Sequence, residues 1–424
     1  MLKAEENDRL TRVGPGTPMG DLFRRYWLPI VAESEMRDRW TKRVRLLGED
    51  LVLFKDRSGR LGLIGEFCPH RRASLAYGIP TADGIRCAYH GWQFDGTGAC
   101  LEQPNEPDGS TFRDKVHTAG YPVRPLGGLL WAYLGPQPAP LIPRLDGFVV
   151  EGAIRTVGHA VIPCNWLQIM ENSVDSLHAE WLHGHFAEFM REKDGIKYAA
   201  ARRTVKIGFD EFEYGITKHR MFAGQTEEDD DWKVGHPVVF PNILAVGNAS
   251  PSQRQYTFQI RVPVDDTHTK HFWYDALTPP EGRSVPSRLF DDVYVYDVPF
   301  LDRNGEFLMN YIYAQDIMVW IQQGPIADRT KEAIGSTDRG LTLYRRMLFR
   351  ELDRVAQGED PKGVIRDPAR NERIDLAVER QMNARADGFA GMLRRHNISH
   401  SPIFEDLVAI FDRGPVAVAA ADRS

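Results

Sequence analysis

The side chains that could carry chemistry first appear as two pairs in the segment FCPHRRASLAYGIPTADGIRCAYHGW. Cys68 with His70 and Cys87 with His90 give the pattern C-x-H-x16-C-x2-H. Two thiolates and two imidazoles suit zinc or iron–sulfur chemistry. Zinc modules usually open with a cysteine pair followed by a histidine pair, whereas each loop here supplies one of each. This order favours a two-iron cluster in which both sulfurs bind one iron and both imidazoles bind the other.

A second group lies in NWLQIMENSVDSLHAEWLHGHF, which contains Asp175, His178 and His183 in one expected helical stretch. On an ideal helix Asp175 and His178 share a face, but His178 and His183 lie about 140° apart. Both histidines can therefore bind one metal only if the helix ends or distorts between them, and Gly184 favours such a distortion. The alternative is that these are surface histidines on an amphipathic helix. This alternative accounts for any single histidine more easily than for the whole group.

Both groups resemble motifs of one family. CPHR, the sixteen-residue spacing and CAYHGWQFD are similar to the Rieske domain of ring-hydroxylating oxygenases, and ENSVDSLHAEWLH resembles their mononuclear iron motif. The resemblance implies a Rieske [2Fe–2S] cluster on the four ligands named above. It also implies a mononuclear non-haem Fe(II) in a 2-His-1-carboxylate site that includes His178 and His183, with O2 as co-substrate.

The same resemblance implies a catalytic role for Asp175 between the two centres. In the family this carboxylate accepts hydrogen bonds from a metal-bound histidine and from a Rieske histidine, which also fixes the imidazole tautomer. The bridge generally crosses between neighbouring subunits. We therefore expect a homo-oligomer, usually a head-to-tail trimer.

The third iron ligand must come from farther along the chain, and spacing alone leaves three candidates. Asp316 opens the apolar segment QDIMVWIQQ, whereas Asp328 in GPIADR and Asp338 in GSTDRG look like cap or turn acids. The family's ligand typically begins such an apolar helix. Asp316 is therefore the expected ligand, with Asp328 as its main competitor.

The segments GPIADRTKEAIGSTDRG and RVPVDDTHT resemble the phthalate-dioxygenase-like branch of the family, as does the N-terminal region. This implies a terminal oxygenase (alpha) subunit that receives electrons from NAD(P)H through a separate reductase carrying flavin and a ferredoxin-type cluster. We expect hydroxylation of an aromatic compound, in the first place an aromatic carboxylate. The alternative is a monooxygenase that carries out oxidative O- or N-dealkylation of an aryl ether or amide.

Alternating hydrophobic segments predict a small antiparallel β domain at about 43–135, followed by the proline-rich linker PQPAPLIP. We expect an α+β fold with two domains: the N-terminal segment and Rieske domain in residues 1–150, and a catalytic mononuclear iron domain in residues 151–424. The second should hold a curved antiparallel sheet flanked by helices. Its expected helices lie near 165–192, 325–356 and 372–397, and its strands near 202–222, 238–248, 253–264 and 271–277.

The hairpin RRTVKIGFDEFEYGITKHR gives a hypothesis for substrate binding. If the chain turns at Asp210 and Glu211, Arg203 lies opposite Lys218 on a face that is apolar near the turn. An aromatic acid could then place its carboxylate against Arg203. The alternative is that both cations lie in solvent beyond the sheet edge.

Composition limits the remaining classes of function. The chain has 424 residues and a formal net charge of −6, with four cysteines. It contains no apolar run long enough to span a membrane and no basic tract that suggests nucleic acid. Four cysteines do not suggest a disulfide scaffold. We expect a cytoplasmic enzyme whose partners are a small aromatic substrate and a reductase.

Overall fold

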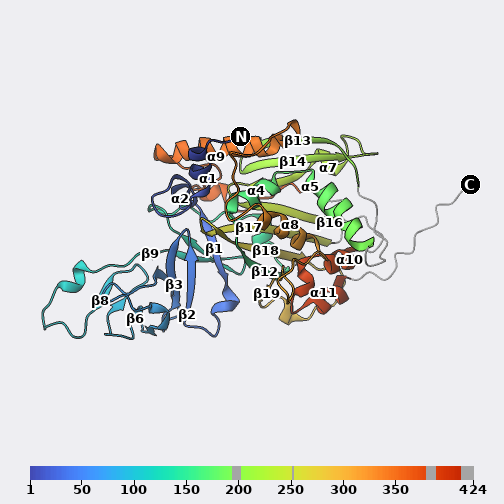
Figure 1. Cartoon of the computed structure of the whole chain (residues 1–424). Helices are drawn as coiled ribbons and strands as arrows, with labels where there is room; N and C mark the ends of the chain where they lie inside the picture. Colours follow the sequence, from blue (N-terminus) through green and yellow to red (C-terminus); the bar gives the residue numbers. More distant parts are fainter. Residues whose placement is uncertain (193–201, 251–252, 379–387, 412–424) are drawn as a thin grey trace, which may run out of the picture.

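The computed structural model describes residues 1–192, 202–250, 253–378 and 388–411. The chain forms a small antiparallel part that extends to one side and a larger part in which helices flank one long sheet (Figure 1). This confirms the predicted α+β fold. Within the described residues no helix is both long and apolar enough to cross a membrane.

Three small sheets build the extended part. Their strands, in spatial order, are β2 (Thr41–Leu46), β3 (Glu49–Lys55), β4 (Leu61–Gly65) and β9 (Gly120–Tyr121); β5 (Ile79–Pro80), β6 (Ile85–Arg86), β7 (Gln93–Phe94) and β8 (Cys100–Glu102); and β1 (Trp27–Ala32), β11 (Leu129–Tyr133) and β10 (Val123–Leu126). A tight hairpin joins β3 to β4. Asp56 Oδ1 accepts hydrogen bonds from the backbone of Ser58 and Arg60, and Gly59 supplies the positive φ of 88° that closes the turn.

An eight-stranded sheet forms the centre of the larger part. Its order is β13 (Thr204–Phe212), β14 (Gly215–Phe222), β15 (His236–Val239), β16 (Ile243–Ser250), β17 (Gln253–Asp265), β18 (His268–Thr278), β12 (Ile154–Ile162) and β19 (Val293–Asp297). All neighbours are antiparallel except β12 and β19.

The two faces of β17 and β18 differ in character. Phe258 and Tyr274 pair across the strands and belong to the main apolar core, where Phe148 packs on both rings. The residues that alternate with them on the opposite face include Gln259 and Arg261, which are also buried. Because side chains alternate along a strand, one face serves the core and the other carries buried polar groups.

The helices of the structure are α1 (Ala4–Thr11), α2 (Pro18–Phe23), α3 (Asp146–Val149), α4 (Trp166–Ser173), α5 (His178–Glu180), α6 (Ala187–Glu192), α7 (Asp230–Lys233), α8 (Ile312–Gln322), α9 (Arg339–Ala356), α10 (Gly388–Arg395) and α11 (Phe404–Phe411). α1 packs on the larger part, where Asn165 Nδ2 donates to the carbonyl of Thr11 at 2.9 Å. The division of the chain at residue 150 stays a prediction.

Two of the predicted helices differ from the structure. The helix expected from residue 325 begins only at Arg339, because the preceding segment instead binds α4, with the Ala327 N–H donating to Gln168 Oε1 at 3.0 Å. Of the helix expected at 372–397, residues 372–378 are not helical, and the Leu376 N–H donates to Asp146 Oδ2. Residues 379–387 lie outside the described residues.

The register predicted for the β13–β14 hairpin is wrong. The strands turn at residues 213–214, with Phe212 paired with Gly215, so Lys218 lies opposite Phe209 rather than opposite Arg203. A Cβ on Gly215 would come within 1.9 Å of the Val238 carbonyl oxygen, which keeps a glycine at that position. Arg203 precedes β13 and its side chain is exposed. The geometry that supported Arg203 as a carboxylate contact is therefore absent.

Candidate metal centres

The two Cys/His pairs lie on neighbouring tight loops of the extended part. Cys68 and His70 follow β4, and Cys87 and His90 connect β6 to β7. The two cysteines are 1% and 3% exposed, whereas His70 is exposed and His90 half-buried. The two imidazole rings have centroids 4.5 Å apart. The sulfurs therefore face the interior and the imidazoles face outward.

The chemistry of this donor set fits an iron–sulfur cluster. All four cysteines of the chain are free thiols. Burial and the adjacent Cys87 together raise the pKa of the Cys68 thiol to about 11. Two buried thiols placed side by side require a cation to become thiolates, and a metal supplies it. The predicted assignment of these four ligands agrees with the geometry and stays a prediction.

The helical stretch after α4 is distorted between the two other histidines. A π-helical turn, η4 (Trp181–Phe186), follows α5 directly. Because a π-helix bonds residue i to residue i+5, it brings residues five apart onto one side of the helix. His178 and His183 are five apart, and their ring centroids lie 5.4 Å from each other. The distortion that the spacing required is thus present.

Asp316 reaches both histidines from α8. Its Oδ1 lies 3.2 Å from Nε2 of His183 and 3.9 Å from Nε2 of His178. One ligand atom of each of the three residues lies within 4.8 Å of the other two. Asp316 is only 6% exposed. These side chains come from segments more than a hundred residues apart, so the fold has gathered a 2-His-1-carboxylate group.

The hydrogen bonds of the two histidines direct their unprotonated nitrogens at Asp316. Nδ1 of His178 lies 3.2 Å from Oδ2 of Asp175. Nδ1 of His183 lies 3.0 Å from Oε1 of Gln315. Both oxygens only accept hydrogen bonds, so each Nδ1 carries the proton and each Nε2 keeps a lone pair. Asp316 Oδ1 faces Nε2 of His183 at 3.2 Å and has no other hydrogen-bond partner among the described residues. Facing lone pairs in a buried place need a cation between them, so the group fits a divalent metal.

Asp175 organises this centre as well as contacting it. Its carboxylate accepts hydrogen bonds from the backbone N–H of Leu177 and His178, which starts the turn that carries His178. Burial raises the pKa of Asp175, but the hydrogen bonds from His178 and from the Leu177 N–H outweigh it and hold the pKa at about 2. The side chain is 39% exposed. An ionised carboxylate is therefore bound to His178 while still accessible from outside.

The other sequence candidates lie elsewhere. Asp328 is exposed in a turn, where Oδ1 accepts from the Thr330 hydroxyl and Oδ2 lies 2.8 Å from Lys331 Nζ. Asp338 accepts a hydrogen bond from the Gly335 N–H at the start of α9. Both are turn acids, as the polar surroundings predicted, and the structure does not bring them to the histidines.

The sequence interpretation missed two residues of this centre. Gln315 binds His183, and its own amide is fixed because Nε2 donates to the Met309 carbonyl at 2.9 Å. Lys218, which is 8% exposed, donates from Nζ to the backbone carbonyl of Asp175 at 3.2 Å. The position of Gln315 directly before Asp316 was the only available signal. The sequence suggested Lys218 only as a cation opposite Arg203, and nothing in the local sequence pointed to its contact with Asp175.

Replacing Gln315 with leucine should weaken the centre without disturbing the cluster loops. Without the amide oxygen the His183 ring loses its fixed tautomer and orientation, and such changes cost about 10- to 100-fold in metal affinity. Retention of Fe(II) against a chelator measures the effect. Gln322→Leu, at the exposed end of the same helix, is the matched control. Equal iron retention in the two variants would contradict the role given to Gln315.

Two family models match separate parts of the chain. A family model described as Rieske [2Fe-2S] domain matches residues 26–119, and one described as LigXa C-terminal domain like matches residues 281–375. The 5,5'-dehydrodivanillate O-demethylase oxygenase subunit of Sphingobium sp. is 44% identical over 381 residues, covering 89% of this chain and 86% of that protein. The phthalate 4,5-dioxygenase oxygenase subunit of Pseudomonas putida is 34% identical over 401 residues, covering 86% and 89%.

Solved structures show the same fold at lower sequence identity. NdmA of Pseudomonas putida CBB5 with caffeine matches with a TM-score of 0.58 and 21% identity, covering 80% of this chain and 93% of that chain. Dicamba monooxygenase bound to dicamba matches with a TM-score of 0.52 and 17% identity, covering 79% and 99%.

Proposed function

This chain belongs to the Rieske non-haem iron oxygenases as a terminal oxygenase subunit, and we propose that its reaction is oxidative O-demethylation of a methoxylated aromatic acid. One observation above all supports the enzyme class. The side chains of His178, His183 and Asp316 meet inside the protein with their lone pairs facing one another. The reaction type draws on the 44% identity to an O-demethylase subunit, against 34% to a phthalate dioxygenase subunit.

The family's two metal groups supply, when bound, single-electron delivery and activation of O2. The chain's own residues hold and orient them. We assign the cluster to the two Cys/His loops and the iron to the triad on η4, α5 and α8. Asp175 and Gln315 fix the two imidazoles so that both Nε2 atoms face Asp316.

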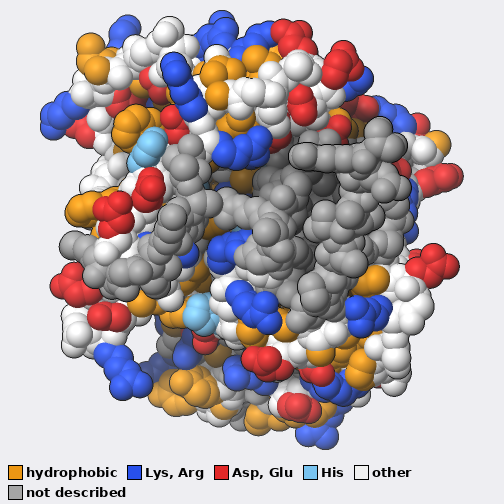
Figure 2. All heavy atoms as spheres, turned by 90° about the vertical axis from the view of Figure 1, so that its right-hand side faces the viewer, with side chains coloured by type: hydrophobic (Ala, Val, Ile, Leu, Met, Phe, Trp, Pro, Cys, Tyr) orange, Lys and Arg blue, Asp and Glu red, His pale blue; other side chains and the backbone are white. Residues whose placement is uncertain are grey.

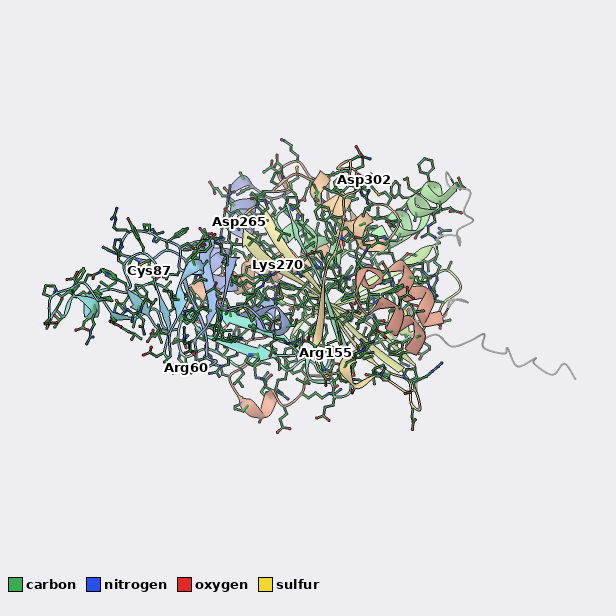
Figure 3. The ribbon with its side chains drawn as sticks, turned by 90° about the horizontal axis from the view of Figure 1, so that it is seen from below. Arg60, Cys87, Arg155, Asp265, Lys270 and Asp302 are labelled. Atoms are coloured by element: carbon green, nitrogen blue, oxygen red, sulfur yellow. The ribbon has the colours of Figure 1, made fainter. Side chains whose placement is uncertain are left out.

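Asp175 is assigned the contact between the two centres. The loops around β6 lie in the extended part, whereas α5 and α8 lie in the larger part (Figure 1). Cys87 likewise lies well to one side of Lys270 and Arg155 when the molecule is seen from below (Figure 3). The accessible side of Asp175 would accept a hydrogen bond from a Rieske histidine of a neighbouring copy. This arrangement makes the working form a head-to-tail ring, with a trimer as the expected size.

Oxygenase subunits of this family work with separate reductases, and here we propose a flavin and ferredoxin-type reductase that draws on NAD(P)H. The substrate is proposed to be anionic. Lys and Arg side chains gather near the centre of the end of the larger part that faces the viewer in Figure 2. Such positive charge raises the local concentration of an anion.

The reaction is tested with 3-methoxybenzoate and related methoxylated acids under labelled O2, with a phthalate-type reductase and NADH. In demethylation one oxygen atom enters the methyl carbon, which leaves as formaldehyde, and two electrons and two protons reduce the other atom to water. The expected products are formaldehyde and a phenol whose oxygen is unlabelled, because that oxygen comes from the ether. Mass spectrometry of the ring product gives the result.

Ring dihydroxylation is the second candidate, favoured by the relatives named phthalate 4,5-dioxygenase and phenoxybenzoate dioxygenase, which are 34% and 33% identical. It places both labelled oxygen atoms on the ring and releases no formaldehyde. A doubly labelled diol from phthalate, with methoxylated acids untouched, would therefore replace the demethylase proposal with a dioxygenase.

A further inference from the structure

Arg261 is a buried cation without an ion pair. It lies on the polar face of β17 and is 1% exposed. Its Nη1 and Nη2 donate to the carbonyl and the side-chain oxygen of Gln259 at 2.9 and 2.7 Å. Its Nε has no hydrogen-bond partner, and no carboxylate among the described residues forms an ion pair with it. An unpaired buried charge costs several kcal/mol, so its presence calls for a specific partner.

Arg261 lies near the proposed iron site, because its register partner His271 packs against Trp320, which follows Asp316 by one turn of α8. The negative charge of Asp316 raises the pKa of Arg261, although the two side chains are not hydrogen-bonded to each other. Burial lowers the pKa of Arg261 to about 9, which leaves the guanidinium charged at neutral pH. When Asp316 and the two neutral histidines bind a divalent metal, the negative charge of Asp316 neutralises part of the charge of the metal. It then no longer balances the charge of Arg261. The metal and Arg261 together then leave this buried region with a surplus of positive charge.

An aromatic cluster with unused N–H donors adjoins this cation through His271. Arg261 pairs in register with His271, whose ring stacks on Trp273 at 3.9 Å and lies nearly parallel to Trp320 at 5.8 Å. The indole nitrogens of both tryptophans are buried without a hydrogen-bond partner among the described residues. Burial and the charge of Arg261 both lower the pKa of His271, so its ring is neutral. The group therefore suits a ligand with an aromatic ring and a negative charge.

Three other cations, two on the sheet and one just before it, differ from Arg261. Arg220 Nε lies 3.7 Å from Asp231, which is also buried. Lys218 donates to the carbonyl of Asp175. Arg203 is exposed at the start of β13. Compared with these three residues, Arg261 is the deeply buried guanidinium that forms no ion pair within the described residues.

We propose that Arg261 is the specificity-determining residue that binds the carboxylate of the aromatic substrate, through Nε and an adjacent Nη, beside the iron site. This inference rests on the proposed function, because it takes an aromatic acid as the substrate. It replaces the predicted contact at Arg203. The subsite would select an aromatic carboxylate over a neutral aromatic compound of the same shape.

Binding without turnover tests the proposal. The iron-loaded holoenzyme is titrated under argon, without reductase, with 4-methoxybenzoate and with the neutral 4-methoxybenzamide, by calorimetry. Arg261→Met should weaken binding of the acid by about 30- to 100-fold, the loss expected for a charge-assisted hydrogen-bond pair. Binding of the amide should change by less than about threefold. Arg203→Met is the matched control and should leave both affinities unchanged.

If Arg261 only stabilises the fold and binds no substrate, its replacement should give a different pattern of Tm and affinities. Removing an unpaired buried charge should leave the Tm of the ligand-free enzyme unchanged or higher. A lower Tm with equal weakening of acid and amide would overturn the proposal, as would weakening of acid binding by Arg203→Met alone. If Arg261→Met does not fold, Arg261→Lys keeps the charge and should still prefer the acid, with about tenfold weaker binding because the planar fork is lost.

The inference and the proposed reaction can fail separately. Formaldehyde release from methoxylated arenes, with no preference of the wild-type enzyme for the acid over the amide, would overturn the role of Arg261 and leave demethylation standing. Selective binding of the acid that disappears in Arg261→Met, together with a doubly labelled diol as product, would support the subsite and overturn demethylation.

Discussion

Replacing Asp316 with alanine is expected to abolish product formation and iron retention at the mononuclear site. The triad would keep its two imidazoles but lose its one negative charge. The metal would then lack the carboxylate that neutralises part of its charge in a buried place. Because the loss of a supporting hydrogen bond already costs about 10- to 100-fold, loss of the ligand itself should exceed about 100-fold. Formaldehyde release and iron content measure the effect.

The Rieske spectrum provides the internal control for this variant. The four cluster ligands lie in the extended part of the chain, away from α8 (Figure 1). Asp316→Ala should therefore keep the visible absorbance of the cluster. Asp328→Ala, in the exposed turn that the sequence left as a competitor, should retain full activity. Activity lost in Asp328→Ala and kept in Asp316→Ala would show that the third ligand is assigned wrongly.

Replacing Glu171 with alanine is expected to cause the largest loss of stability. Its carboxylate is hydrogen-bonded by Arg329 Nη2 at 2.6 Å and by Arg345 Nε at 2.7 Å, and the side chains of Glu171 and Arg329 are 9% and 0% exposed. Burial raises the pKa of Glu171, but the two guanidinium groups lower it overall, so it is ionised. Alanine would leave Arg329 buried with no carboxylate, while Arg345 keeps Glu332.

Breaking a buried ion pair on one side costs about 3–5 kcal/mol, and the same loss is expected for Glu171→Ala. Urea unfolding of the variant and the wild type measures the difference in the free energy of unfolding. Asp360→Ala is the control, because its pair with Arg366 is 33% and 42% exposed and should contribute less than about 1 kcal/mol. A loss below 1 kcal/mol for Glu171→Ala would mean that the two arginines find other partners.

Local geometry explains what the sequence could predict. The two Cys/His loops are short, and ligand types at fixed spacing on tight turns leave the side chains few arrangements. The turn at Asp56 and the N-cap Thr17, whose Oγ1 accepts from the Gly20 N–H, are likewise set by side chains close in the sequence. The angle between His178 and His183 on an ideal helix even predicted a distortion, because helix geometry is fixed by its hydrogen bonds.

Tertiary structure decided everything that depends on distant segments or on strand register. Asp316 could not be separated from Asp328 by spacing, since more than a hundred residues lie between either acid and the histidines. Gln315 acquires a role only because α8 packs against η4. Register depends on which residue tolerates close contact with the next strand, as Gly215 does with Val238. A shift of the turn moves every cation of a hairpin, which is why Arg203 was misplaced.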